Sequence, residues 1–505
     1  MHSQYQEFTR NLEAEDWANW DKYARRVRAL HIGEYRKSPI LSKELLDEIA
    51  RTRVSLHILP NLRSLTWIAY RIDHMRASLI FMHHGITRFT THLVASSEYA
   101  IGTYFKEIQT RMPYLEHIDF RFSFPVREIE DDVVRLIQGL PKLKRIVFPV
   151  YTLTSRIVEA LSRLPKLETV QFEFPSPNPQ GQGDPKDIMD FSPQLDPGAF
   201  PALLDLSLSG HLSHYTTFLT GPFYPENLTV LYSHVCWDSS PEDVDKFVTT
   251  VAENCHSLTE LHIDYFGSPP VPSSGNIAAL EPRTSRRLSW QELRPILSCT
   301  HLTVFELRWD KPLAVSEDDL EEMASHWPAL KTLQLDCEPM DISIEPSITL
   351  RALLPFAKHC QELEQLGLYM APFTDTSKTA LGLGATPFRS LKQLCVGLSP
   401  IQDPGPVALY LSQLCPSGCR LEAGMTWPDE FVPVESEDLQ RRSAEWHETW
   451  QEVNRMLPLL IRLREEERAN RTTLDEEVED LRIRNRLLLD TPPAGFHPDN
   501  RCIIC

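Results

Sequence analysis

The most regular pattern of apolar and polar positions lies in residues 316–336, which read SEDDLEEMASHWPALKTLQLD. The first half begins with a serine and an aspartate spaced as in a capping box, and its apolar residues recur at helical spacing. The second half alternates apolar and polar residues, as in a short strand that buries one face. The apolar positions are Leu320, Met323, Trp327, Leu330, Leu333 and Leu335. The pattern predicts a unit of one helix followed by one strand.

The strand part of this unit, L-x-x-L-x-L with other apolar residues allowed, recurs along most of the chain. The copies begin at Val27, Leu62, Ile86, Leu115, Leu143, Leu167, Leu203, Leu228, Leu258, Leu302, Leu330, Leu363 and Leu391. Most steps fall in or near the period of about 20–29 residues that is typical of leucine-rich repeats. One helix and one strand cannot bury their apolar faces alone, whereas stacked copies can. We therefore predict an α/β fold, a curved leucine-rich-repeat solenoid of about 12–13 irregular repeats, with a parallel inner sheet, outer helices and a C-terminal helical segment.

Changes in composition along the chain predict its domain organisation. Two long steps between copies contain proline-rich insertions, near residues 175–201 and 267–288, which are expected to form surface loops. The expected divisions are an N-terminal helical cap in residues 1–26, the solenoid in 27–426, C-terminal helices in 427–490 and a flexible tail in 491–505.

The C-terminal region is predicted to contain two helices, in residues 437–469 and 473–489. Pro458 should bend or split the first, because proline lacks the N–H that a helix interior needs. Thr473 and Glu476 have the spacing of a capping box at the start of the second. Two heptads are short for a coiled coil, so we expect this region to pack against the last repeats as a cap.

Charge and composition narrow the functional classes. Among 505 residues, 51 Lys and Arg stand against 70 Asp and Glu, a net charge of −19. Such an acidic balance argues against broad nucleic-acid binding, which relies on neutralising phosphates. There is no apolar run of the roughly 20 residues that a spanning helix needs, and the N-terminus has no apolar signal core. We expect a cytoplasmic or nuclear protein whose ten cysteines are free thiols.

Catalytic and cofactor motifs are not found in the sequence, so we predict a non-enzymatic protein without cofactor or metal. His83 and His84 are adjacent but have no second ligand pair at a useful spacing. Cys255, Cys299 and Cys360 each stand three residues before the first strand leucine of a repeat. This shared register indicates core positions at the corner between helix and strand.

The polar residues between the strand leucines should point away from the core, onto the inner face of the sheet. They could bind a protein partner, or they could be a solvated surface without one. Acids outnumber bases in this set, which favours a basic or hydrogen-bonding protein partner. The candidate partner-binding residues are His117, Asp119, Arg121, Gln171, Glu173, Ser207, Tyr232, His262, Asp264, Glu306, Arg308, Gln334, Asp336 and Tyr369.

The last four residues, Cys502-Ile503-Ile504-Cys505, have the form of a prenylation motif, although a terminal cysteine is unusual in it. If Cys502 is prenylated, the chain would attach to a membrane, and one lipid chain would hold it weakly. A lipid-anchored peripheral scaffold is therefore the alternative function.

Several segments resemble the fungal F-box/leucine-rich-repeat proteins, especially those of mushroom-forming fungi. The segments are Asp16-Trp17, residues 23–30 (YARRVRAL), 59–67 (LPNLRSLTW), 302–307 (LTVFEL) and 457–467 (LPLLIRLREEE). In that family an N-terminal F-box docks a Skp-type adaptor of a cullin ubiquitin ligase, and the repeats recruit a substrate. Only about fifteen residues precede Asp16, so the resemblance implies a substrate receptor without an evident F-box, and docking of a Skp-type adaptor is doubtful.

Overall fold

The computed structural model describes residues 5–6, 8–33, 40–96, 99–172, 182–221, 227–236, 239–265, 287–339, 341–371, 386–425 and 437–490. Glu173, most of the insertion near 267–288, and the tail with Cys502 lie outside these residues.

One parallel sheet of 14 strands runs through the described part of the chain, and its strands follow one another in sequence order. They are β2 (Ala29–Ile32), β4 (Ser64–Trp67), β5 (Arg88–His92), β6 (His117–Arg121), β7 (Arg145–Phe148), β8 (Thr169–Phe172), β9 (Asp205–Gly210), β10 (Val230–Val235), β11 (Glu260–Tyr265), β12 (Val304–Arg308), β13 (Thr332–Leu335), β14 (Gln365–Leu368), β15 (Gln393–Gly397) and β16 (Arg420–Ala423). A separate parallel pair joins β1 (Tyr5–Gln6) to β3 (Ile40–Leu41).

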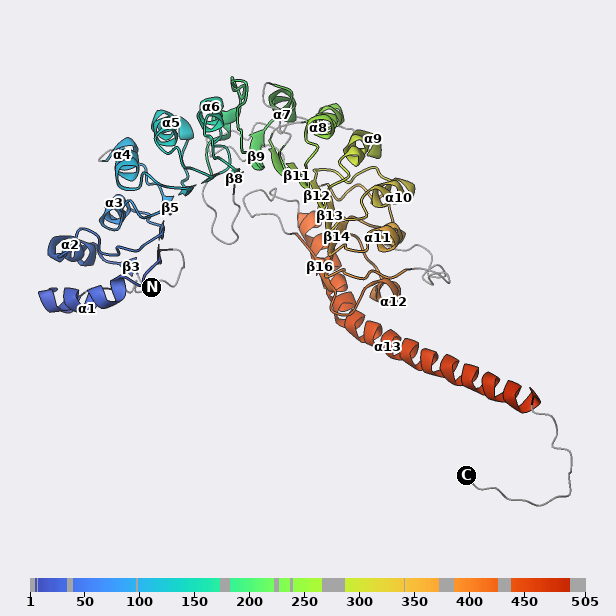
Figure 1. Cartoon of the computed structure of the whole chain (residues 1–505). Helices are drawn as coiled ribbons and strands as arrows, with labels where there is room; N and C mark the ends of the chain where they lie inside the picture. Colours follow the sequence, from blue (N-terminus) through green and yellow to red (C-terminus); the bar gives the residue numbers. More distant parts are fainter. Residues whose placement is uncertain are drawn as a thin grey trace, which may run out of the picture.

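Helices cover the outer side of the sheet, and together they form an open arc with the strands inside (Figure 1). They are α1 (Ala14–Ala24), α2 (Lys43–Thr52), α3 (Ile72–Ala77), α4 (Ile101–Arg111), α5 (Glu130–Gln138), α6 (Ser155–Ser162), α7 (Leu212–Leu219), α8 (Pro241–Asn254), α9 (Trp290–Leu293), α10 (Glu317–His326), α11 (Leu353–His359) and α12 (Pro404–Leu414). Short 3-10 helices are η1 (Ser78–Ile80), η2 (Val126–Glu128), η3 (Pro185–Ile188), η4 (Arg294–Ser298) and η5 (Leu350–Ala352). A helix is about 10 Å wide whereas neighbouring strands are about 4.8 Å apart, so stacking the repeats bends the molecule around its sheet. The predicted solenoid is confirmed.

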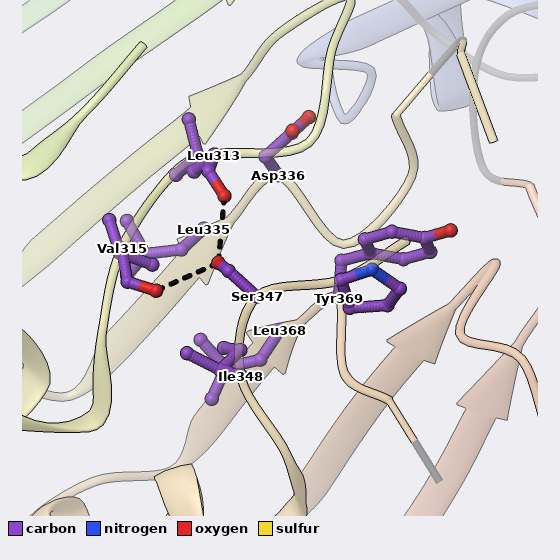
Figure 2. A pocket seen from close by; sticks show the side chains of 9 residues that line it. Leu313, Val315, Leu335, Asp336, Ser347, Ile348, Leu368 and Tyr369 are labelled. Carbon is purple, nitrogen blue, oxygen red and sulfur yellow. Dashed lines mark hydrogen bonds between the residues drawn. The ribbon is translucent and has the colours of Figure 1, made fainter. Parts of the chain in front are cut away.

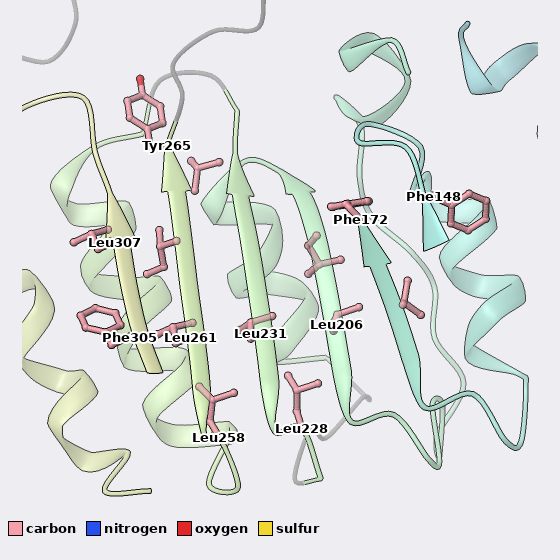
Figure 3. Close-up of a cluster of buried hydrophobic side chains, with 14 of the residues drawn as sticks. Phe148, Phe172, Leu206, Leu228, Leu231, Leu258, Leu261, Tyr265, Phe305 and Leu307 are labelled. Carbon is pink, nitrogen blue, oxygen red and sulfur yellow. The ribbon is translucent and has the colours of Figure 1, made fainter. Parts of the chain in front are cut away.

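The repeat leucines form the core between the sheet and the helices. Leu206, Leu231, Leu261 and Phe305 occupy one register row on β9 to β12, and all four are buried. Figure 3 shows this row together with the leucines that precede two of the strands. Each buried side chain of this size contributes about 1.5–3 kcal/mol before conformational entropy is subtracted.

The unit in residues 316–336 folds as its sequence predicts. The Ser316 hydroxyl accepts a hydrogen bond from the Asp319 N–H (3.3 Å), and the Asp319 carboxylate accepts one from the Ser316 N–H (2.8 Å). This reciprocal cap satisfies two donors at the start of α10, and β13 follows after a short turn.

Two parts of the fold differ from the expectation. The strand β16 was not predicted, because Gly418 and Ala423 stand where the repeat pattern has its first and third apolar residues. In the first insertion, residues 182–201 pack on the solenoid instead of forming only a surface loop: Ile188, in η3, is fully buried. Arg127 holds this segment through ion pairs with Asp184 (2.7 Å) and Asp187.

The expectation of two C-terminal helices is wrong, since a single helix, α13, spans Glu437–Asp490. Pro458 lies inside it at an exposed position, while Leu457 and Ile461 beside it are buried. These anchors hold the helix on both sides of the proline. Thr473 lies within the helix, where its hydroxyl donates to the Ala469 carbonyl (3.0 Å).

The two ends of α13 have different surroundings. Its first half packs on α12 and β16 and buries Trp450 and Val453, so this part caps the solenoid as expected. Its second half extends away from the arc (Figure 1), and Leu474 and Leu481 there are more than half exposed. The second half therefore does not pack on the last repeats.

Candidate functional site on the inner face of the sheet

The inner face consists of side chains at alternate strand positions, aligned by the parallel register into rows that cross the sheet. Its central part, on β10 to β12, is an ionic network. Asp264 is only 2% exposed, and it accepts a hydrogen bond of 2.7 Å from the Tyr232 hydroxyl. The Arg308 Nη1 lies 3.2 Å from each carboxylate oxygen of Asp264. Burial lowers the pKa of Arg308, but Asp264 and Glu306 outweigh it and raise that pKa above its ordinary value.

A second ionic group lies beside the first, on β11 and β12. The ring of His262 lies between two carboxylates, with Nδ1 at 3.1 Å from Glu306 and Nε2 at 3.9 Å from Glu260. Burial lowers the pKa of His262, but hydrogen bonding to Glu260 and Glu306 outweighs it and raises the pKa to about 9. The imidazole is therefore a cation at neutral pH.

These two groups together neutralise most of their own charge. Three carboxylates, on Glu260, Asp264 and Glu306, face two cations, on His262 and Arg308. Most of the acidic charge that the sequence indicated here is thus neutralised within the protein, and one carboxylate remains in excess. This smaller excess is weak support for a basic partner.

Four of the candidate residues are buried, contrary to the expectation that they face solvent: Ser207, Asp264, Asp336 and Tyr369. Asp336 follows β13 with a left-handed backbone (φ 46°), and its carboxylate accepts a hydrogen bond from the Trp309 N–H (2.9 Å). The strand alternation has ended there, so its side chain fixes a turn. Tyr369 packs in a small apolar cluster that Trp446 of α13 covers.

A small cavity lies beside Asp336 and Tyr369 (Figure 2). The hydroxyl of Ser347 reaches the carbonyls of Leu313 (3.0 Å) and Val315 (2.7 Å) at its wall. The cavity measures about 10 Å³, which is room for one water molecule at most. An open cleft of about 430 Å³ lies beside the contact between β16 and α13 and is lined in part by Asn454 and Pro458.

The inner face of β5 to β7 is cationic. Arg88, His117 and Arg145 are register partners on three neighbouring strands, and we call them the arginine row. Arg88 is exposed, and within the described part of the chain its side chain has no ion pair or hydrogen bond. Burial, and then the charges of Arg88 and Arg145, lower the pKa of His117. This ring is therefore neutral near pH 7.

Further along the inner face of β5 and β6, the side chains are neutral or paired. His92 Nδ1 lies 2.8 Å from the Ala69 carbonyl, and burial lowers its pKa. Arg121 lies 3.5 Å from Asp119 on its own strand. The sequence prediction included His117, Asp119 and Arg121, but it missed Arg88 and Arg145. Both stand directly before the middle apolar residue of their repeats, as His117 does. This shared repeat position could have identified them as residues of the inner face.

The remaining candidates contact neighbouring strands. Gln171 donates a hydrogen bond to Asp205, and burial raises the pKa of Asp205 to about 6. Gln334 lies over Gly367, where a Cβ would come within 1.6 Å of its amide oxygen.

Histidine and cysteine side chains have clear structural settings. His83 Nε2 lies 2.9 Å from the Leu59 carbonyl, and its Nδ1 accepts from the Gly85 N–H (3.0 Å), so both ring nitrogens have partners.

The corner residues Cys255, Cys299 and Cys360 are buried, which confirms their assignment to the core. In the described part of the chain, one group of three has its possible metal-ligand atoms within 4.8 Å of one another: Cys337, Glu338 and Cys395.

Comparisons with known proteins leave the family open. No family model matches the chain, and no curated protein matches it. A matching solved structure is a crystal structure of a protein from Bacteroides fragilis, with a TM-score of 0.29 and 14% sequence identity over 57% of this chain and 69% of that one. A likeness at this level carries no argument about function, and the resemblance to F-box/leucine-rich-repeat proteins stays a prediction. None of the described helices has the length and apolar character needed to cross a bilayer.

Proposed function

We propose that this protein is a non-catalytic recognition scaffold that binds an acidic segment of a protein partner on its inner face. The observation that supports the proposal is the arginine row. Its members stand on adjacent strands, about 4.8 Å apart per strand, so Arg88 and Arg145 flank His117 on the same face of the sheet. Asp205 acts electrostatically on Arg145 from one side, whereas Arg88 has no counter-charge among the described residues.

An acidic segment would supply the missing charge. Guanidinium groups bind carboxylates through two parallel hydrogen bonds, which gives both strength and orientation. Neutral His117, between the two arginines, adds a hydrogen-bonding group without adding charge. The strands line the inner side of the arc (Figure 1), so an extended segment that crosses them would contact several repeats in turn.

A direct test uses a fluorescent glutamate-rich peptide and the full chain, with binding measured by fluorescence anisotropy at low and physiological salt. We expect the Arg88→Glu, Arg145→Glu double variant to bind about tenfold more weakly or worse. The matched control is Arg468→Glu, because Arg468 is exposed on the projecting half of α13. Equal binding by the double variant and the control, or tighter binding of a lysine-rich peptide by the unmodified chain, would contradict the proposal.

The resemblance to F-box/leucine-rich-repeat proteins supports a finer form of the proposal, a substrate receptor related to cullin-type ubiquitin ligases. Affinity purification of the tagged chain from its host tests it: a Skp-type adaptor and a cullin should co-purify. If neither does while a partner is retained, the protein is a scaffold without a ligase role.

The C-terminal sequence Cys502-Ile503-Ile504-Cys505, which lies outside the described residues, supports the alternative of a lipid-anchored scaffold. Cell fractionation distinguishes it, since Cys502→Ser should then move the chain from the membrane fraction to the supernatant. An intact mass without the lipid in the native host would exclude the anchor.

A further inference from the structure

Two cysteines that are far apart in sequence meet at the ends of β13 and β15. Cys337 follows Asp336 directly after β13, and Cys395 is on β15. Their sulfur atoms are 3.5 Å apart, and a carboxylate oxygen of Glu338 lies within 4.8 Å of both. All three side chains are buried.

Two glycines make this approach possible. Gly367, on the intervening strand β14, leaves the space in which the Gln334 amide lies. Gly397 has a left-handed backbone (φ 48°), and a Cβ there would come within 1.9 Å of the Cys337 carbonyl oxygen. The Leu398 N–H donates to the same oxygen (3.0 Å), which fastens the segment after β13 across the end of β15. Gly397 therefore has no room for a side chain, whereas a side chain at Gly367 would displace the Gln334 amide.

The donor atoms suit a borderline-soft divalent cation. Two sulfur atoms and one carboxylate oxygen converge, and the Gln334 amide oxygen lies 3.4 Å from the Cys337 sulfur. Zinc–sulfur bonds of about 2.3 Å at tetrahedral angles place two thiolates about 3.8 Å apart, close to the 3.5 Å here. A disulfide would require about 2.05 Å.

We propose that Cys337, Cys395 and Glu338 bind a zinc ion, with the Gln334 amide oxygen as the fourth donor. Binding replaces the two thiol protons, which leave to solvent, and forms two zinc–sulfur bonds. Two thiolates and one carboxylate carry three negative charges against the two positive charges of the ion. Arg308, on which Cys337 and Glu338 both act electrostatically, supplies a further positive charge nearby. The ion would fasten β13 to β15 across β14. This inference is independent of the proposed function.

The test measures metal on the full chain. After purification with zinc present and dialysis against metal-free buffer, elemental analysis should give one zinc per chain. Replacing zinc with cobalt should give thiolate-to-cobalt charge-transfer absorption in the near ultraviolet and strong tetrahedral bands in the visible.

Variants separate this site from the other thiols. Cys337→Ser and Cys395→Ser should each lower the retained zinc by at least tenfold and abolish the charge-transfer band. Cys360→Ser is the control, because Cys360 is equally buried but lies at a helix–strand corner. Circular dichroism shows whether each variant is folded. If a variant does not fold, the cobalt spectrum of the unmodified chain still tests the site. Absence of the charge-transfer band in the folded unmodified chain, a full band in Cys337→Ser, or an intact mass that shows a Cys337–Cys395 disulfide would overturn the proposal.

Discussion

The inner faces of β5–β7 and of β10–β12 carry polar side chains at the same repeat positions, yet these residues have different physical states. On β10–β12, cations and carboxylates alternate between neighbouring strands and form buried ion pairs around Asp264. On β5–β7, Arg88, His117 and Arg145 place positive or neutral groups side by side. The first region therefore stabilises the solenoid, whereas the second keeps the exposed charge of Arg88, which the proposed acidic partner would neutralise.

The largest expected effect tests the structural role of the first region. Asp264→Ala removes the buried carboxylate that accepts from the Tyr232 hydroxyl and pairs with the half-buried Arg308. Breaking a buried pair costs about 3–5 kcal/mol. Arg88→Ala, at an exposed position of the arginine row, should change stability by no more than about 0.5 kcal/mol. Urea unfolding of both variants measures the difference. If the two variants lose similar amounts of unfolding free energy, the two regions do not differ in their contribution to stability.

The pH dependence of stability tests the same region. The folded pKa of His262, about 9, lies above its ordinary value of 6.5. Protonated His262 therefore contributes its full stabilisation, about 3 kcal/mol, below pH 6.5. This contribution is lost as the pH rises towards 9, because His262 loses its proton and Glu260 and Glu306 lose the cation between them. Urea unfolding at several pH values should show this decline. The control variant His262→Gln should not show this decline. If its free energy of unfolding falls equally steeply with pH, another group causes the decline.

The smallest expected effect concerns the arginine row. Arg88→Gln removes one of the positive charges that lower the pKa of His117, so that pKa should rise towards its ordinary value. Burial is the larger cause and is unaffected, so the rise should be partial. Histidine NMR titration measures it, with Arg468→Gln as a distant control. An unchanged pKa would show that Arg88 and His117 do not interact across the strands.

The sequence predicted the features that depend on local periodicity. Buried leucines such as Leu330, Leu333 and Leu335 must recur with the strand period, so the repeat, the core and the order of helices and strands could be read from residues close together in the chain. The same method missed β16, where the apolar pattern is incomplete. It also divided α13 after residue 469 and expected Pro458 to bend or split the first part, whereas the helix is continuous. At Pro458 the buried anchors Leu457 and Ile461 outweigh the propensity of a single residue.

The candidate site depended on contacts that no local pattern contains. Tyr232 and Asp264 are separated by 32 residues, Asp264 and Arg308 by 44, and Cys337 and Cys395 by 58. The sequence alone determined that a polar face would line the inside of an arc, since strand alternation requires it. Only the tertiary structure decided which of those polar groups neutralise one another and which stay available, because strand register and the turns after the strands set the distances between charges.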